Sequence, residues 1–265
     1  MPSRTMIDVG KQVRLNRILN PATGNMVMIP MDHGVILGPI CGIVDPADTV
    51  DKVIEGGADA VAFNAGMAAS LYTRYMNRCG TVFQLTNAIT DEDDLTLIAS
   101  VEYALRHGAD AISIQVILGS KHERQMLDDA RGVADACSRW GLPLLMMMYP
   151  TDKLLEQLGP EAVLRAARAG AELGADIVKT SYPGDRDTFQ RLVDACPVPV
   201  VVAGGPQKET VSEVLQMIED AMSCGAIGIA LGRNVWQSAD PTRMVASIVE
   251  LVHQGKKVSE LSWTG

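Results

Sequence analysis

Hydrophobic residues recur along this chain in short continuous runs rather than in alternation with polar residues. Such a run, bounded by polar residues, is typical of a strand buried on both faces, as in a parallel sheet. The pattern predicts eight strands, at 26–34, 59–64, 81–86, 110–117, 143–149, 176–181, 198–203 and 227–231.

The segments between these runs have the three-to-four-residue period of amphipathic helices. One predicted apolar face groups Met126, Ala130, Val133, Cys137 and Trp140, and another groups Val211, Val214, Leu215, Ile218 and Met222.

An opening segment also has near-helical spacing, with Val9, Val13 and Ile18 or Leu19 before Pro21 and Gly24 end it. We expect this helix to cap one end of the fold.

A weak internal repeat supports the alternation of helices and strands. Gly57, Gly108, Gly174 and Gly225 each stand where a helix should end and a strand begin. Eight strands alternating with eight helical segments predict a single (β/α)8 TIM barrel over 1–265 with a short N-terminal helical extension. The alternative is an open doubly wound sheet, but no GxGxxG follows the first strand, as a dinucleotide site would require.

Charge and composition narrow the class of partner. The 265 residues include 23 Lys and Arg against 32 Asp and Glu, a net charge of −9, with no basic cluster interleaved with aromatics. This charge distribution argues against nucleic acid as a binding partner. No run approaches the 18 or so apolar residues of a membrane span, and the first 25 residues are polar. Five scattered cysteines without a CxxC pair suit reduced thiols, which we expect to be small core residues of a cytoplasmic protein.

Lys179 is the most informative single residue, because it ends the apolar run of a predicted strand. Burial disfavours the ammonium form and lowers the pKa from about 10.4, which makes a neutral, nucleophilic amine available for Schiff-base formation with a carbonyl substrate. The alternative is a lysine whose stem lines the strand while its head reaches solvent or a carboxylate.

Two glycine-bearing strand ends predict a phosphate site. Gly204 and Gly205 follow the seventh strand, and Gly232 and Arg233 follow the eighth. Glycines let backbone N–H groups approach an anion, a helix N-terminus adds its dipole, and arginine supplies a forked cationic donor. Alternatively, each glycine only makes a tight turn.

Other strand-end residues could move protons or line the substrate. Asp32 could orient a hydroxyl or move a proton, or else cap a helix; Tyr149 could act as a general acid or base, or else be a rim aromatic. His33 is more often structural in such a turn. The four histidines, His33, His107, His122 and His253, do not suggest converging metal ligands, so we expect chemistry without a metal or other cofactor.

Five motifs together resemble the archaeal-type class I aldolases, the group of fructose-bisphosphate aldolase and 2-amino-3,7-dideoxy-D-threo-hept-6-ulosonate synthase. The motifs are PMDHGVILGP, MMMYP, DIVKTSYPGD, VVVAGGP and ALGRN, and they extend over nearly the whole chain. The resemblance implies Lys179 as the Schiff-base lysine, Tyr149 as the proton-transfer residue, Asp32 as its acidic partner and a phosphate site at the glycine loops with Arg233. It also implies a ring-forming homo-oligomer, such as a decamer.

The chain departs from the heptulosonate-synthase pattern on the other side of the predicted barrel. Where that pattern has histidines, this chain has Asn64, Gln84 and Gln115, which keep hydrogen-bonding capacity but cannot take up a proton near neutral pH. We expect these amides, with His33 and Ser181, to face the far end of the substrate, and the identity of the aldehyde is therefore open.

The sequence thus favours a class I aldolase that acts on a small phosphorylated sugar or ketone and an aldehyde, most simply of the fructose-bisphosphate or dihydroxyacetone-phosphate type. The alternative within the class is aldol transfer of the heptulosonate-synthase type. From another class, a phosphosugar isomerase or a non-catalytic phosphometabolite-binding barrel would use the same phosphate loops without a covalent role for Lys179.

Overall fold

The computed structural model describes residues 8–88, 94–205 and 207–262. Its main sheet is a closed parallel barrel in the strand order β1-β10-β9-β8-β7-β6-β3-β2. The barrel strands are β1 (Met26–Pro30), β2 (Ala60–Asn64), β3 (Gly80–Gln84), β6 (Ala111–Leu118), β7 (Leu144–Pro150), β8 (Ile177–Ser181), β9 (Val200–Ala203) and β10 (Gly228–Ala230). Each of the eight predicted strands is present, and the predicted (β/α)8 barrel is confirmed.

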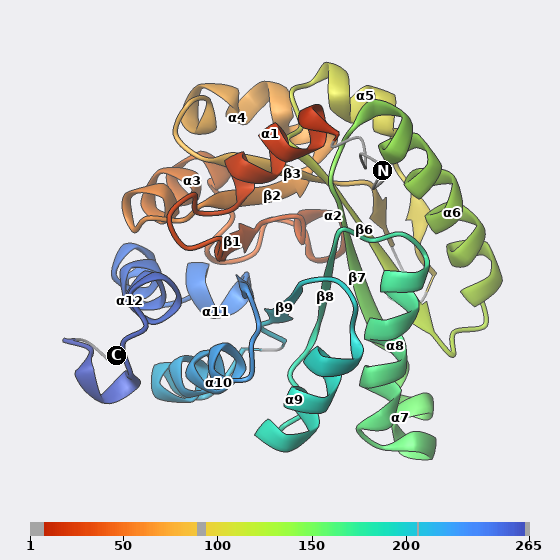
Figure 1. The fold of residues 1–265 in the computed structure, drawn as a ribbon. Helices are drawn as coiled ribbons and strands as arrows, with labels where there is room; N and C mark the ends of the chain where they lie inside the picture. Colours follow the sequence, from red (N-terminus) through yellow and green to blue (C-terminus); the bar gives the residue numbers. More distant parts are fainter. Residues whose placement is uncertain (1–7, 89–93, 206, 263–265) are drawn as a thin grey trace, which may run out of the picture.

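Helices surround the barrel and pack against its outer surface (Figure 1). The described helices are α1 (Val9–Ile18), α2 (Gly34–Leu37), α3 (Pro46–Glu55), α4 (Ala68–Tyr75), α5 (Val101–Arg106), α6 (Glu123–Trp140), α7 (Asp152–Leu158), α8 (Glu161–Glu172), α9 (Arg186–Ala195), α10 (Val211–Ser223), α11 (Arg233–Trp236) and α12 (Pro241–Gln254), with 3-10 turns at Ala65–Met67 and Val258–Glu260.

The apolar runs are continuous because both faces of each strand are buried. In β1, Met26 and Met28 belong to the cluster that fills the barrel interior, whereas Val27 and Ile29 pack outward under the helices. The same two-residue alternation decides which polar side chains of later strands point into the barrel.

The internal repeat has a structural explanation at the amino-terminal ends of the strands. The four repeat glycines have φ of 85° to 98°, the left-handed region in which a helix can end without a side-chain clash. In three repeats the aspartate that follows accepts a backbone N–H of the neighbouring strand: Val27 to Asp59 at 2.6 Å, Thr81 to Asp110 at 3.0 Å and Leu144 to Asp176 at 2.8 Å. The repeat therefore marks where strands are tied together.

Helix α1 closes this same end of the barrel. Lys11 pairs with Asp176 and Arg17 with Asp110, each at 2.9 Å, and Ile18 is fully buried in the interior cluster. The expected cap is thus confirmed, but its predicted apolar face is wrong in part. Val9 and Val13 are 68% and 47% exposed, because only the last turn of α1 enters the barrel.

Three other features differ from the sequence-based expectation. A short antiparallel pair, β4 (Thr86–Asn87) and β5 (Thr96–Leu97), follows β3 and was not predicted. Trp140 is exposed at the end of α6, where its Nε1 donates to Glu102 at 3.1 Å, so its placement on the buried face is wrong. Among the cysteines, Cys137, Cys196 and Cys224 are buried as expected, whereas Cys41 is exposed and Cys79 half-buried.

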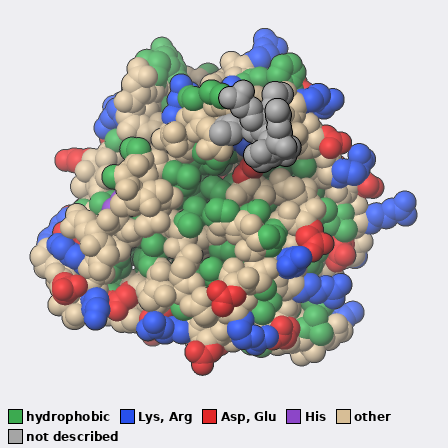
Figure 2. All heavy atoms as spheres, viewed as in Figure 1, with side chains coloured by type: hydrophobic (Ala, Val, Ile, Leu, Met, Phe, Trp, Pro, Cys, Tyr) green, Lys and Arg blue, Asp and Glu red, His purple; other side chains and the backbone are tan. Residues whose placement is uncertain are grey.

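Charged side chains of both signs are interspersed around the face of the molecule in Figure 2, and hydrophobic side chains gather toward its centre. In the described part of the chain, no helix has the length and apolar character needed to cross a membrane.

Candidate active site

A cavity of about 240 Å³ lies at the carboxyl ends of the barrel strands. It brings together residues that stand far apart in the sequence and that were predicted as site residues. The predicted residues lining it are Asp32, His33, Gln84, Gln115, Tyr149, Lys179, Ser181, Gly204, Gly205, Gly232 and Arg233.

A larger hollow of about 700 Å³ lies near the amino ends of the strands, beside α4 and α5. Its lining includes Arg17 and Asp110, which pair with each other to hold α1, and none of the predicted site residues. The chemistry suggested by the sequence is therefore confined to the smaller cavity.

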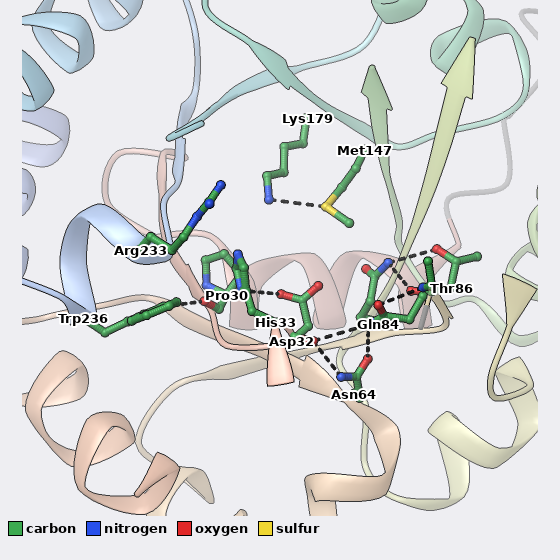
Figure 3. Close-up of polar contacts among 12 residues, drawn as sticks. Pro30, Asp32, His33, Asn64, Gln84, Thr86, Met147, Lys179, Arg233 and Trp236 are labelled. Atoms are coloured by element: carbon green, nitrogen blue, oxygen red, sulfur yellow. Dashed lines mark hydrogen bonds and ion pairs between the residues drawn. The ribbon is translucent and has the colours of Figure 1, made fainter. Parts of the chain in front are cut away.

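Lys179 points into the cavity because of the strand alternation in β8. Thr180 faces outward, where its Oγ1 donates to the Met148 carbonyl at 2.7 Å, and Lys179 on the opposite face is only 7% exposed. Its Nζ contacts the Met147 Sδ at 3.3 Å (Figure 3). Burial lowers the pKa of the Lys179 amine, and the nearby negative charge of Asp32 opposes that shift in part. At a given pH, a larger fraction of the Lys179 amine is therefore neutral than in an exposed lysine.

Tyr149 lies two residues after Met147 on β7, on the same face of the strand, and half-buried. Burial raises the pKa of its phenol, and the charge of Asp32 raises it further. The phenol therefore keeps its proton at neutral pH and can donate a hydrogen bond or a proton within the cavity.

Asp32 follows β1 and is held through its backbone by two asparagine side chains. Asn64 Nδ2 donates to the Asp32 carbonyl at 2.9 Å and Asn87 Nδ2 at 3.3 Å, and Asn87 also donates to Asn64 Oδ1 at 3.2 Å. Asn64 is not among the residues that line the cavity. It lies behind Asp32, and its amide positions the acid rather than facing the cavity.

His33 lies beside Asp32, with its Nδ1 3.5 Å from Asp32 Oδ1. Its ring packs edge-on against Trp236, whose Nε1 donates to the Pro30 carbonyl at 3.1 Å. Burial is the main cause that lowers the pKa of His33, and the Asp32 charge opposes it. The residue thus contributes a neutral, packed ring to the wall of the cavity.

The glycine loops form the side of the cavity next to Arg233. Arg233 Nη2 donates to the Gly205 carbonyl at 3.3 Å, while the buried Nε has no hydrogen-bond partner among the described residues. A Cβ at Gly232 would lie 2.9 Å from both the Pro30 carbonyl oxygen and His33 Cε1, so only glycine fits there. An unpartnered guanidinium N–H beside the glycine loops that follow β9 and β10 is suited to an anion.

A helix begins at one of these two loops: α11 starts at Arg233, with Gly232 as its N-cap residue. Helix α10 begins at Val211, several residues beyond Gly205, and α11 has only four residues. The Arg233 guanidinium supplies the permanent positive charge on this side of the cavity.

Among the lining residues that were not predicted from the sequence, Thr86, Asn87 and Met147 are those with side-chain oxygen, nitrogen or sulfur atoms. Met147 could have been found, because it shares the inward parity of Tyr149 on β7. Thr86 and Asn87 belong to the unexpected pair β4 and β5, so their position could not be read from the strand pattern. Among the described residues, no group of three or more His, Cys, Asp or Glu is placed to hold a metal ion.

Comparison with known proteins decides the family. Residues 26–238 match the model of the DeoC/LacD family aldolases. The chain belongs to this family. It is 39% identical over 251 residues to a 2-amino-3,7-dideoxy-D-threo-hept-6-ulosonate synthase of Halobacterium salinarum, covering 94% of this chain and 93% of that one.

Two further relatives within or near this family are informative. The chain is 35% identical to a 2-amino-4,5-dihydroxy-6-oxo-7-(phosphonooxy)heptanoate synthase of Streptomyces griseus, covering 92% of this chain and 90% of the relative. An archaeal fructose-1,6-bisphosphate aldolase, solved with its catalytic lysine covalently bound to the carbinolamine intermediate, superimposes with a TM-score of 0.81 at 29% identity, covering 91% of this chain and 99% of that one. The prediction of a Schiff-base aldolase is therefore confirmed at the level of the family.

Proposed function

We propose that this aldolase forms a Schiff base between Lys179 and the ketone of a small phosphorylated ketose, and makes or breaks the adjacent carbon–carbon bond. The observation that carries the proposal is the buried Lys179 amine, whose pKa is lowered and which shares one cavity with Tyr149 and Asp32. Among the described residues, no salt bridge holds this amine in its charged form.

The covalent step begins when the neutral Lys179 amine adds to the ketone carbon, and loss of water gives an iminium ion. In the cleavage direction, a base takes the proton of the substrate hydroxyl, the aldehyde departs, and the bonding electron pair moves into the iminium to give an enamine. Protonation of the enamine carbon and hydrolysis then release the ketone and restore the amine.

Tyr149 and Asp32 are suited to the two proton-transfer roles. The raised pKa of Tyr149 keeps the phenol protonated, so it can supply a proton, whereas the Asp32 carboxylate can accept one. The hydrogen bonds from Asn64 and Asn87 fix the Asp32 backbone and so limit where its carboxylate can go.

The phosphate of the substrate is expected to bind at Gly204, Gly205, Gly232 and Arg233. The buried, unpartnered Arg233 Nε supports this assignment. The names of two relatives also share a ketone next to a carbon that carries phosphate, since the Streptomyces griseus product is 6-oxo-7-(phosphonooxy) and the archaeal aldolase acts on fructose 1,6-bisphosphate. Holding the phosphate would place the ketone carbon against the amine.

Borohydride trapping tests the covalent role directly. Intact-mass spectrometry after reduction with dihydroxyacetone phosphate should show one adduct in the wild-type protein and none in Lys179→Met. The matched control is Lys153→Met, on the exposed surface of α7, which should give the wild-type adduct. Turnover by a folded Lys179→Met protein would refute the mechanism.

The relatives are named for fructose 1,6-bisphosphate and for a 2-amino-heptulosonate. The two reactions to compare are therefore fructose-bisphosphate cleavage and, as the alternative that we propose, aldol transfer onto an amino-acid semialdehyde. Product analysis with fructose 1,6-bisphosphate, and with the ketone plus a semialdehyde, separates them. We also expect the protein to be cytoplasmic and to form a homo-oligomer. A light-scattering mass equal to the 28.4 kDa of one chain would contradict the oligomer.

A further inference from the structure

The cavity has one charged side and one uncharged side. Arg233, on the β9 and β10 side, is the one permanent cation among the described lining residues. Across the barrel, on the side of β3 and β6, the lining residues have only amides, a hydroxyl and an apolar side chain. They are Gln84 of β3, Thr86 and Asn87 of β4, Leu95 just before β5, and Gln115 of β6. Figure 3 shows Arg233 and Gln84 on opposite sides of Lys179 and Asp32.

The amide of Gln84 is fixed with its acceptor toward the cavity. Gln84 Nε2 donates to the Thr86 carbonyl at 2.9 Å and to Thr86 Oγ1 at 3.0 Å. A backbone carbonyl can only accept, so the nitrogen must face Thr86, and the oxygen turns to the side of Asp32 (Figure 3). An oriented carbonyl oxygen accepts a hydroxyl proton and repels the oxygens of a phosphate or carboxylate.

No described residue places a positively charged side chain on the β3 and β6 side of the cavity. Lys121 and His122 follow β6 but do not line the cavity. The Nδ1 of His122 lies 3.6 Å from the Oδ1 of Asp94. Residues 89–93, outside the described part of the chain, have the sequence ITDED and include no lysine, arginine or histidine. Among the described residues, a second phosphate or a carboxylate would therefore have no positively charged partner on this side.

We infer that the β3 and β6 side of the cavity receives an uncharged, hydroxyl-bearing aldehyde, in preference to a phosphorylated aldehyde or an amino-acid semialdehyde. This inference rests on the proposed aldol reaction at Lys179. In the synthetic direction, the enamine carbon of the bound ketone bonds to the aldehyde carbon, and the aldehyde oxygen gains a proton and becomes a hydroxyl. The hydroxyls of the aldehyde would meet Gln84 and Gln115.

The electrostatic reason is the cost of burying an anion without a cation. A charged group taken out of water needs a partner of opposite charge or several donors, and an amide carbonyl provides neither. An uncharged hydroxyaldehyde pays no such cost and satisfies the Gln84 oxygen. An unpaired charge on this side disfavours the charged aldehydes and so contributes to specificity. We expect kcat/KM for the uncharged aldehyde to exceed that for each charged aldehyde by at least ~10-fold.

The test uses the wild-type protein with dihydroxyacetone phosphate as the common ketone. kcat/KM is measured with glyceraldehyde, glyceraldehyde 3-phosphate and an amino-acid semialdehyde. We expect glyceraldehyde to be favoured at least ~10-fold over each of the others. Preference for either charged aldehyde, with the Lys179 adduct still trapped, overturns this inference alone. Absence of the trapped adduct overturns the proposed function.

A charge placed on the uncharged side should reverse the preference. Gln115 is half-buried, and its side chain makes no hydrogen bond within the described residues, so Gln115→Arg introduces a cation that cannot itself form an imine. The kcat/KM ratio of phosphorylated to unphosphorylated aldehyde should rise at least ~10-fold. The matched control, Gln254→Arg at the exposed end of α12, should leave the ratio unchanged. An unchanged ratio in a folded Gln115→Arg protein contradicts the inference.

Discussion

At the scale of the residue, the Asp32 carboxylate acts on the pKa values of Lys179 and Tyr149, as well as on that of His33. The Asp32 charge raises the pKa of Lys179 against the lowering effect of burial, and it raises the pKa of Tyr149 in the same direction as burial. Asp32 thus makes the amine harder to deprotonate while keeping the phenol protonated. A substitution that removes the charge without changing the size of the side chain removes both effects and leaves burial unchanged.

Asp32→Asn should move the acidic limb of adduct formation to lower pH. Removing the negative charge removes the interaction that favours the Lys179 ammonium, so the amine becomes neutral at a lower pH. The measurement is the initial rate of borohydride-trapped adduct as a function of pH, in the wild type and the variant. Overall turnover should nevertheless fall, because the proton acceptor is lost. A limb that stays in place or moves to higher pH would contradict the electrostatic account.

Lys179→Met should raise the stability of the folded protein at pH 7. The pKa of Lys179 is lower in the folded chain than the ~10.4 of the unfolded one, so between these two values the unfolded chain binds more protons and stability rises with pH. A methionine at this position does not titrate, so this contribution to the free energy of unfolding is absent in the variant. The Tm of the variant should exceed that of the wild type by roughly 2–4 °C for each kcal/mol by which the free energy of unfolding increases. The difference in Tm should narrow as the pH approaches ~10.4. A difference independent of pH would show that packing, not protonation, is responsible.

The sequence located much of the site because strand parity and strand ends are local properties. Lys179 and Tyr149 were found because each ends an apolar run, and Gly232 because it follows the last predicted strand. The structure adds that a side chain at Gly232 would clash with Pro30 and His33. The role of Asn64 could not be found this way. Whether an amide faces the cavity or holds the Asp32 backbone depends on Asn87, which lies 23 positions later and on another element.

At the scale of the element, α1 contributes through its last turn. Ile18 is fully buried among the interior residues of the barrel, and Lys11 and Arg17 fix the helix to strand-end aspartates. Both pairs are partly exposed, so each contributes little on its own. Most of the stabilisation by α1 should therefore come from the burial of Ile18.

Ile18→Ala should destabilise the protein by about 2–5 kcal/mol, the usual range for emptying a packed aliphatic site. Val13→Ala, at a 47% exposed position of the same helix, is the matched control and should change the free energy of unfolding by less than about 0.5 kcal/mol. Urea denaturation of both variants is the measurement. Equal effects of the two variants would contradict the conclusion that α1 stabilises the fold mainly through the burial of Ile18.

The elements were predictable to different degrees for physical reasons. Barrel strands are buried on both faces, so their apolar runs are continuous and easily recognised. The β4 and β5 strands have two residues each, too short for any period to appear. The buried face of α1 was predicted incorrectly because apolar spacing indicates a stripe along the whole helix. The helix instead contacts the barrel with its end, through Ile18.

At the scale of the whole molecule, the net charge opposes the expected ligand. The chain carries −9, and charges of both signs are mixed on the face shown in Figure 2, so long-range attraction for a phosphate ester is not provided. Binding must depend on short-range contacts within the cavity. Arg233 is the described lining residue able to supply a permanent positive charge there.

Phosphate binding should therefore raise the stability of the whole protein through Arg233. A ligand that binds only the folded state stabilises it by about 2.7 kcal/mol at a concentration of 100 times Kd, which corresponds to a Tm increase of roughly 5–10 °C for a chain of this size. Inorganic phosphate is the probe, and thermal unfolding is the measurement. Arg233→Met should abolish the increase, whereas Arg165→Met, on the exposed surface of α8, should retain it. Lys179→Met should also retain it, because phosphate recognition and amine chemistry occupy different strands. Loss of the increase in Lys179→Met with its retention in Arg233→Met would place the anion at the lysine and overturn the assignment of the glycine loops.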